Sequence, residues 1–115
     1  LKDIINRGGE KFGTEEVENL IRSHPAVADV AVVAMPDELL IERACAYLVP
    51  RAGQAAPDVK SLGRFLEEKG LAKFKFPERI EPLDAFPVTR VGKLDKAELR
   101  RRIAEKLAQE KKSAA

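Results

Sequence analysis

Hydrophobic residues recur at the spacing of an α-helix in three separate parts of this sequence. They fall three or four residues apart, so each set lies along one side of a helix: Val17, Leu20 and Ile21; Val59, Leu62, Phe65 and Leu66; Leu99, Ile103 and Leu107. Thr14, Asp58 and Asp95 precede these sets and are residue types that favour helix N-caps. Pro25 is expected to end the first helix and Gly70 the second.

Apolar stretches rich in valine and alanine predict two buried strands, at residues 27–35 and 43–49. Pro36 and Pro50 follow these stretches and are expected to end them. The connection between the two strands is short, so we expect them to pair antiparallel. Residues 79–83 predict a third, shorter strand.

Two short extended pieces flank Gly8 and Gly9 near the start of the chain and indicate a hairpin. The order of elements is then hairpin, helix, strand, strand, helix, strand, helix. This order predicts an α+β domain: a small antiparallel or mixed sheet of about three strands, flanking helices and an N-terminal hairpin. The tail at residues 111–115 is expected to fray.

Composition narrows the class of protein. The 115 residues are enough for one small domain with its own core, and not for two. A net charge of +2 argues against nucleic acid as a partner, and the absence of a long apolar run argues against a membrane. Cys45 is the only cysteine, which fits a reducing, cytoplasmic location. Because the chain starts at Leu1 and its only methionine is Met35, we expect a piece of a longer protein.

Several chemistries are excluded by the residue types present. His24 is the only histidine, so we assign no metal site and no Ser/His/Asp system. Gly8 and Gly9 are not followed by the Gly-Lys-Ser/Thr of a P-loop. Glu15 and Glu16 are adjacent, so on a helix they point in different directions and form no facing acid–base pair. The 115 residues are therefore predicted to hold no complete active site.

One lysine stands apart by its surroundings. Pro87 and Gly92 bracket a short loop, Lys93 follows the glycine, and a helix begins after Asp95, with Glu98 at capping-box spacing. A lysine on such a loop is a mobile point charge with three donors, suited to phosphate or carboxylate oxygens. Local spacing alone favours the alternative, a solvated surface lysine ahead of a helix.

Three stretches together resemble the C-terminal domain of adenylate-forming enzymes, the superfamily of acyl-CoA synthetases, luciferases and peptide-synthetase adenylation domains. They are residues 1–11 with 15–18, residues 74–77 (Phe-Lys-Phe-Pro), and residues 87–99 (Pro-x4-Gly-Lys-x2-Lys-x2-Leu). In that family the lysine of the last motif is catalytic, so the resemblance assigns this role to Lys93.

Other segments are similar to a narrower group, the aryl-acid ligases of siderophore biosynthesis, which activate 2,3-dihydroxybenzoate or salicylate. These segments are residues 6–11, 23–27 and 44–49. Ile41 departs from the group, because such enzymes usually have glycine before the glutamate that is Glu42 here.

The resemblance implies a two-step reaction and a large N-terminal domain that binds ATP, Mg²⁺ and the acid. A carboxylate first attacks the α-phosphate of ATP, and a phosphopantetheine thiol then displaces AMP. The C-terminal domain rotates between the steps, with Lys2 at the hinge position and Gly8 and Gly9 lining the path of the pantetheine arm. Lys11 and Lys75 are candidates to contact phosphate or an acidic carrier protein. The isolated 115 residues are predicted to be inactive.

Three functions remain open on the sequence. The first is an aryl-acid–AMP ligase that loads a carrier protein, and the second is an acyl- or aryl-CoA synthetase that uses free CoA. The third is a non-catalytic interaction module, against which the Gly92–Lys93 pair argues, since a docking module does not need it.

Overall fold

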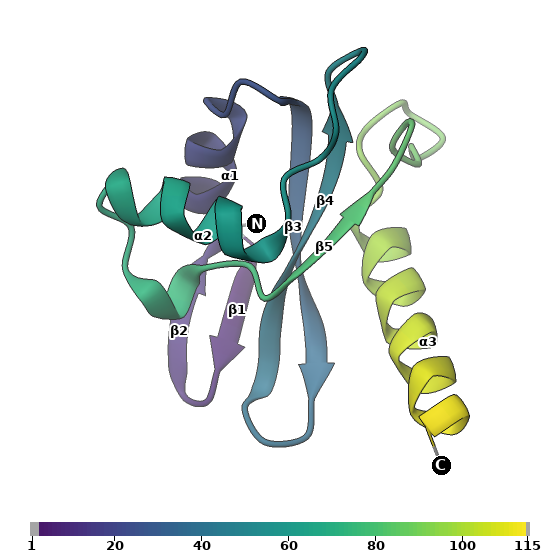
Figure 1. Ribbon diagram of the computed structural model, residues 1–115. Helices are drawn as coiled ribbons and strands as arrows, with labels where there is room; N and C mark the ends of the chain where they lie inside the picture. The colour runs from purple at the N-terminus through teal and green to yellow at the C-terminus, as the bar shows by residue number, and fades with distance from the viewer. Residues whose placement is uncertain (1–2, 115) are drawn as a thin grey trace.

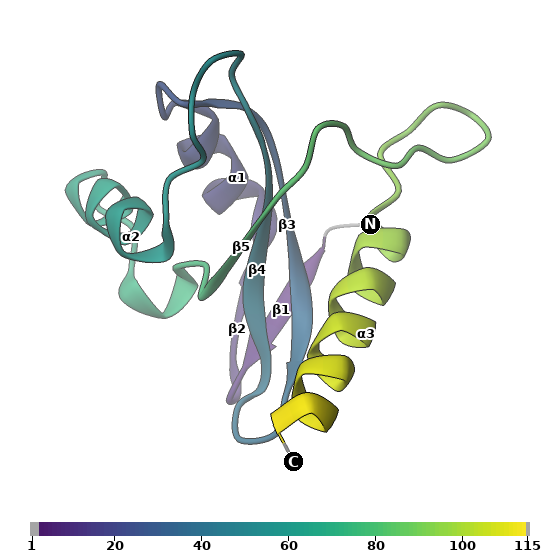
Figure 2. The same ribbon diagram turned by 45° about the vertical axis from the view of Figure 1, so that its right-hand side comes forward.

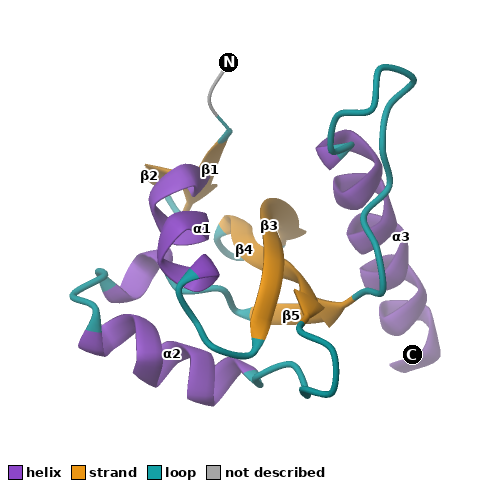
Figure 3. Cartoon of the chain, turned by 90° about the horizontal axis from the view of Figure 1, so that it is seen from above, coloured by secondary structure: helices purple, strands orange, loops and turns teal. Residues whose placement is uncertain are grey.

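The chain folds into a five-stranded sheet with helices on both faces, as the computed structural model of residues 3–114 shows (Figures 1 and 3). Its elements are β1 (Ile4–Arg7), β2 (Glu10–Gly13), α1 (Thr14–Arg22), β3 (Val27–Asp37), β4 (Ile41–Pro50), α2 (Val59–Glu68), a 3₁₀ turn (Lys73–Lys75), β5 (Arg79–Pro82) and α3 (Lys96–Ala114). The predicted α+β class and the N-terminal hairpin are confirmed. The two hairpin strands join the three central strands in one sheet.

Strand β4 organises the sheet because three other strands pair with it. Along one edge it pairs antiparallel with β3 over almost its whole length. Along its other edge β1 meets it at a single pair, Arg7 with Ile41, and β5 runs parallel to residues 45–48. Strand β2 pairs only with β1. The hairpin therefore joins the sheet at the start of β4, close to the turn between β3 and β4.

Alternate residues of β3 and β4 belong to two separate hydrophobic cores. Val30 and Val32 pack with α1 and α2, whereas Ala31 and Val33 pack with α3. Helices α1 and α2 lie on one face of the sheet and α3 lies on the other (Figure 2). Both strands are thus buried on both faces, which explains their continuous apolar sequence.

Helix α3 is held against the sheet by apolar packing and by one buried hydrogen bond. Leu99 and Ile103 are fully buried, and the Tyr47 hydroxyl donates to the carbonyl oxygen of Leu99 at 3.2 Å. Burial raises the pKa of Tyr47 to about 12 and that of the neighbouring Cys45 thiol to about 12. Cys45 is a core residue, as its strand sequence predicted.

Three predicted boundaries were wrong. Pro36 does not end β3, which continues to Asp37; β3 lies at the edge of the sheet, where a missing N–H is tolerated. Thr14 is the buried first residue of α1, and Gly13 takes the N-cap position without a side-chain hydrogen bond. The tail does not fray at residue 111, because α3 runs to Ala114 and Lys111 pairs with Glu38 of the β3–β4 turn.

The other two predicted caps are confirmed. Asp58 accepts a hydrogen bond from the backbone N–H of Ser61 at 2.8 Å, and Asp95 accepts one from that of Glu98 at 3.1 Å. The Glu98 carboxylate does not complete a capping box. It binds Arg101 and Arg102 on the next turn of α3 instead, and these hydrogen bonds lower its pKa to about 2.

Candidate functional site

Lys93 lies on an exposed loop whose backbone is closed like a small hairpin. Asp95 N–H donates to the Pro87 carbonyl at 2.9 Å, and Thr89 N–H donates to the Lys93 carbonyl at 2.8 Å. Val88 and Leu94 form an isolated β-bridge between these two bonds. The loop is therefore ordered by its own backbone, and this order does not depend on the Lys93 side chain.

The turn at the tip of this loop requires a glycine. Gly92 has φ +83°, and its N–H donates to the Thr89 carbonyl at 2.9 Å. Lys93 follows directly and is exposed, and within residues 3–114 its ammonium group has no hydrogen-bond or ion-pair partner. The ammonium group is thus available to an external anion.

Gly8 and Gly9 form the turn between β1 and β2, with φ +61° and +98°. Two-residue hairpin turns in which both residues have positive φ favour glycine. The Asn6 side chain accepts a hydrogen bond from Gly9 N–H at 2.9 Å. A Cβ at Gly8 would lie 3.1 Å from Leu40 Cδ2, whereas a Cβ at Gly9 would meet nothing within 4 Å. The Gly9 backbone therefore faces open space, and Gly8 packs against the β3–β4 turn.

The β3–β4 turn supports the glycine turn through the Leu40 carbonyl. That oxygen accepts hydrogen bonds from Gly8 N–H at 2.6 Å and from Glu42 N–H at 2.7 Å. The second bond closes a γ-turn around Ile41, whose φ is +69°, a conformation that strains a β-branched residue. Asp37 accepts from the N–H groups of Leu39 and Leu40, and these bonds lower its pKa.

Replacing Ile41 with glycine is expected to stabilise the chain by about 0.5–1 kcal/mol. The left-handed conformation costs a residue with a side chain about 1–2 kcal/mol, and the entropic cost of glycine offsets part of this gain. Urea unfolding of the 115-residue chain measures the change. The control is Leu39→Gly, an exposed neighbour without positive φ, which should be slightly destabilised. An equal loss of stability in both variants would show that Ile41 is not strained.

A charged network that the sequence did not reveal joins the glycine turn to the Phe-Lys-Phe-Pro segment. Arg7, directly before Gly8, makes two hydrogen bonds to Glu78, at 2.8 and 3.2 Å, and Glu78 directly follows Pro77. These bonds raise the pKa of Arg7. Arg43 reaches the same carboxylate at 3.4 Å. The contact spans 71 positions of sequence, so local spacing carried no signal for it.

The two predicted lysine contacts have different surroundings. Lys75 pairs with Glu16 at 2.8 Å and lies over the ring of Phe74. Lys11 is exposed on β2, and its backbone lies opposite that of Asn6 in the hairpin. Lys2, the predicted hinge, lies outside the described residues.

The loop of Lys93 and the turn of Gly8–Gly9 lie at opposite ends of the molecule. In Figure 1 the glycine turn is at the lower end of the sheet, and the light-green loop before α3 is at the upper right. Figure 2 shows the same separation after rotation. The structure therefore does not bring Lys93 and Gly9 into one site.

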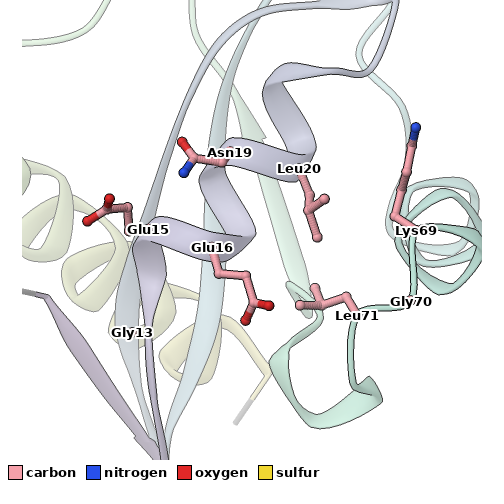
Figure 4. Close-up of a pocket in the computed structure, with 8 residues that line it drawn as sticks. All are labelled: Gly13, Glu15, Glu16, Asn19, Leu20, Lys69, Gly70 and Leu71. Atoms are coloured by element: carbon pink, nitrogen blue, oxygen red, sulfur yellow. The ribbon is translucent and has the colours of Figure 1, made fainter.

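The hollow shown in Figure 4 lies between α1 and the end of α2 and does not contain these residues. Its lining residues are Gly13, Glu15, Glu16, Asn19, Leu20, Lys69, Gly70 and Leu71. Residues 3–114 include no group of three or more His, Cys, Asp or Glu side chains arranged to hold a metal ion. None of the helices in this range is both long and apolar enough to cross a bilayer. The candidate site is thus a pair of exposed loops.

Residues 16–93 match a known sequence family, the AMP-binding enzyme C-terminal domain. The chain belongs to this family. The match ends at Lys93, so it includes this lysine and the part of the loop that precedes it, whereas Gly8 and Gly9 lie before the matched residues. The predicted superfamily is therefore confirmed.

Individual relatives also confirm the narrower resemblance. The chain is 55% identical over 106 residues to the pyochelin synthase PchD of Pseudomonas aeruginosa, covering 92% of the chain and 19% of the relative. It is 53% identical to the 2,3-dihydroxybenzoate-AMP ligase of Bacillus subtilis, with the same coverage of 92% and 19%. This AMP-binding enzyme C-terminal domain spans about a fifth of the length of the curated relatives that it matches.

A solved structure shares the fold. The apo structure of MbtA from Mycobacterium smegmatis superposes with a TM-score of 0.79 at 37% identity, covering 87% of this chain and 19% of that one. The likeness therefore covers most of the α+β arrangement described above.

Proposed function

We propose that this chain is the mobile C-terminal domain of an ATP-dependent ligase that adenylates an aryl acid of the 2,3-dihydroxybenzoate or salicylate class. The ligase then transfers the acyl group to the phosphopantetheine thiol of a carrier protein. The proposal is supported by the family, by relatives that include a 2,3-dihydroxybenzoate-AMP ligase, and by Lys93, which lies on an exposed loop and has no ion-pair partner within residues 3–114. A large N-terminal domain would supply the pockets for ATP and the acid, and the reaction would take place in the cytoplasm.

Lys93 would act in the first step. As the carboxylate approaches the α-phosphate, two negatively charged groups come close together, and an ammonium group between them reduces their repulsion. Two unit charges about 4 Å apart interact with roughly 4 kcal/mol at an effective dielectric of about 20. Part of this energy would lower the barrier, because Lys93 enters the site without losing an ion pair within residues 3–114.

Gly8 and Gly9 would act in the second step. A backbone turn without side chains lets another chain approach closely, and a Cβ at Gly9 would meet nothing within 4 Å. A pantetheine arm could therefore pass along this turn. The reaction products of the two steps are an acyl-adenylate with pyrophosphate, then a thioester with AMP.

The observation that carries the proposal is the placement of these two loops at opposite ends of the domain (Figure 1). One rotation near Lys2 would exchange them at a fixed active site. The test is to assay the full-length enzyme for pyrophosphate exchange with each acid, and for thioester formation with CoA and with a phosphopantetheinylated carrier protein. Exchange with neither aryl acid would overturn the proposed substrate class, and thioester formation only with CoA would overturn the proposed acceptor.

The isolated 115-residue chain is expected to fold but to show no ATP–pyrophosphate exchange. Lys93 and Gly9 lie on exposed loops, and neither lines the hollow between α1 and α2. Circular dichroism would establish folding, and exchange would be measured against the full-length enzyme at equal concentration. Clear exchange by the folded fragment would contradict a separate N-terminal catalytic domain.

A further inference from the structure

A partly buried cluster of charges lies between the N-terminal segment and the start of α3. At its centre, the Lys96 ammonium group lies 2.7 Å from a Glu18 carboxylate oxygen and 3.1 Å from one of Asp3. It also donates to Thr14 Oγ1 at 3.2 Å and to the Val32 carbonyl at 3.3 Å. One lysine thus joins the segment before β1, helix α1, strand β3 and helix α3.

The partners of Lys96 are themselves fixed. Glu18 is 7% exposed and accepts a hydrogen bond from Val32 N–H at 2.8 Å. Arg100, one turn further along α3, binds the other Asp3 oxygen at 3.3 Å, and the Asp3 carbonyl accepts from Thr14 N–H at 3.1 Å. Asp3 is therefore held by two cations of α3 and by the backbone at the start of α1. Displacing a member of this network is therefore costly, because it leaves the remaining charges with fewer partners.

The cluster lies next to two sites that come from different sequence motifs, the Lys93 loop and the predicted hinge at Lys2. Lys96 is the first residue of α3, three residues after Lys93, and Asp3 directly follows Lys2. Between Lys93 and Lys96, Leu94 packs against the core under α3, and Asp95 closes the loop by its bond to Pro87. The base of the Lys93 loop is therefore anchored within one residue of the predicted hinge.

We propose that Lys96 and Asp3 are positioning residues that fix Lys93 relative to the hinge, so that rotation of the domain delivers its ammonium group accurately for adenylation. This inference rests on the proposed function. The glycine turn does not need the anchor, because β1 runs directly from Asp3 towards Gly8. Loss of the anchor should therefore harm adenylation and spare thioester formation. A misplacement of about 1 Å is enough to reduce a rate about 10²-fold.

The main test is Asp3→Asn in the full-length enzyme, because it keeps the Lys96–Glu18 pair and so leaves no unpaired buried carboxylate. Pyrophosphate exchange is expected to fall by about 10–100-fold through kcat, with little change in KM for ATP. Transfer from a supplied acyl-adenylate should stay within about threefold of wild type. Lys96→Met should show the same selectivity at a lower melting temperature, and Lys96→Arg should restore part of the exchange. The matched control is Asp29→Asn, which also removes a carboxylate that binds one arginine, Arg22.

A double variant separates positioning from a general loss of stability. In the Lys93→Ala background, Asp3→Asn should cause no further loss of exchange, since it would act only through Lys93. A further loss there, or an equal loss of both half-reactions in Asp3→Asn alone, would overturn the inference. If Asp3→Asn exchanged pyrophosphate at the wild-type rate while Lys93→Ala did not, the positioning role of Asp3 would be overturned. The proposed function would then be unaffected. Wild-type exchange in Lys93→Ala would instead overturn the proposed function.

Discussion

Replacing Lys93 with alanine is expected to reduce adenylation in the full-length enzyme by about 10²–10³-fold. The substitution removes the attraction between the ammonium group and the carboxylate and phosphate oxygens, which come close together in the transition state. A loss of about 3–4 kcal/mol in this attraction corresponds to a rate reduced by about 10²–10³-fold. The substitution should not disturb the loop, because its closing hydrogen bonds are formed by backbone groups and by Thr89. ATP–pyrophosphate exchange with saturating acid measures the effect.

The same variant should transfer a supplied acyl-adenylate to the thiol at nearly the wild-type rate. During that step the opposite end of the domain would face the active site, and Lys93 would lie away from it. The control is Arg90→Ala, which removes an exposed cation from the same loop and should keep most of the exchange activity. An equal loss in Arg90→Ala would mean that general loop charge matters and not the ammonium group of Lys93. Equal loss of both half-reactions in Lys93→Ala would contradict alternation.

Replacing Gly9 with leucine is expected to produce the opposite pattern: thioester formation reduced by about 10²-fold or more, and pyrophosphate exchange close to wild type. A side chain at Gly9 would project into open space, where the proposed path of the pantetheine arm runs. Gly8 is a poorer choice, because its Cβ would press against Leu40 within the domain. Single-turnover thioester formation from a preformed adenylate isolates the affected step.

Backbone strain must be separated from obstruction in this experiment, because Gly9 has φ +98° and a leucine there costs about 1–2 kcal/mol. Gly53 offers a matched control. It has φ +77°, and its Cβ would also meet nothing within 4 Å. It belongs to the segment between β4 and α2, which lies at the upper end of the sheet (Figure 1). Gly53→Leu should lose a similar amount of stability while forming thioester normally. If the two leucine variants were equally impaired in thioester formation, strain and not obstruction would be the cause.

The sequence predicted those parts of the fold that depend on neighbouring residues. The apolar runs of β3 and β4 follow from burial on two faces, and Asp58 and Asp95 cap their helices through bonds three residues away. Pro36 was misinterpreted because its tolerance depends on β3 lying at the edge of the sheet, which only the topology shows.

The site divides in the same way. The sequence motifs identified both Lys93 and the glycine turn. Gly8, Gly9 and Gly92 have positive φ, a conformation that favours glycine, so these glycines are visible in the sequence. Lys96 belongs to the motif at residues 87–99, but the sequence indicated no partner for it, and Glu18 resembled an ordinary surface glutamate of an amphipathic helix. Their contact joins positions 18 and 96 and becomes visible only when α1, β3 and α3 are placed together. The resemblance identified Ile41 as a departure from glycine, and the structure shows that this position has positive φ in the γ-turn beside Gly8.

The hydrogen bond from Tyr47 to Leu99 gives the chain a built-in optical reporter. The 115 residues contain one tyrosine and no tryptophan, so excitation near the red edge of tyrosine absorption selects a single ring. That ring lies in the core beneath α3, and its hydroxyl is bonded to the helix itself. Its fluorescence therefore follows the docking of α3, whereas far-ultraviolet circular dichroism follows all helices together. Comparing the two signals during unfolding would reveal whether the helix that carries the lysine loop detaches before the remainder of the domain melts.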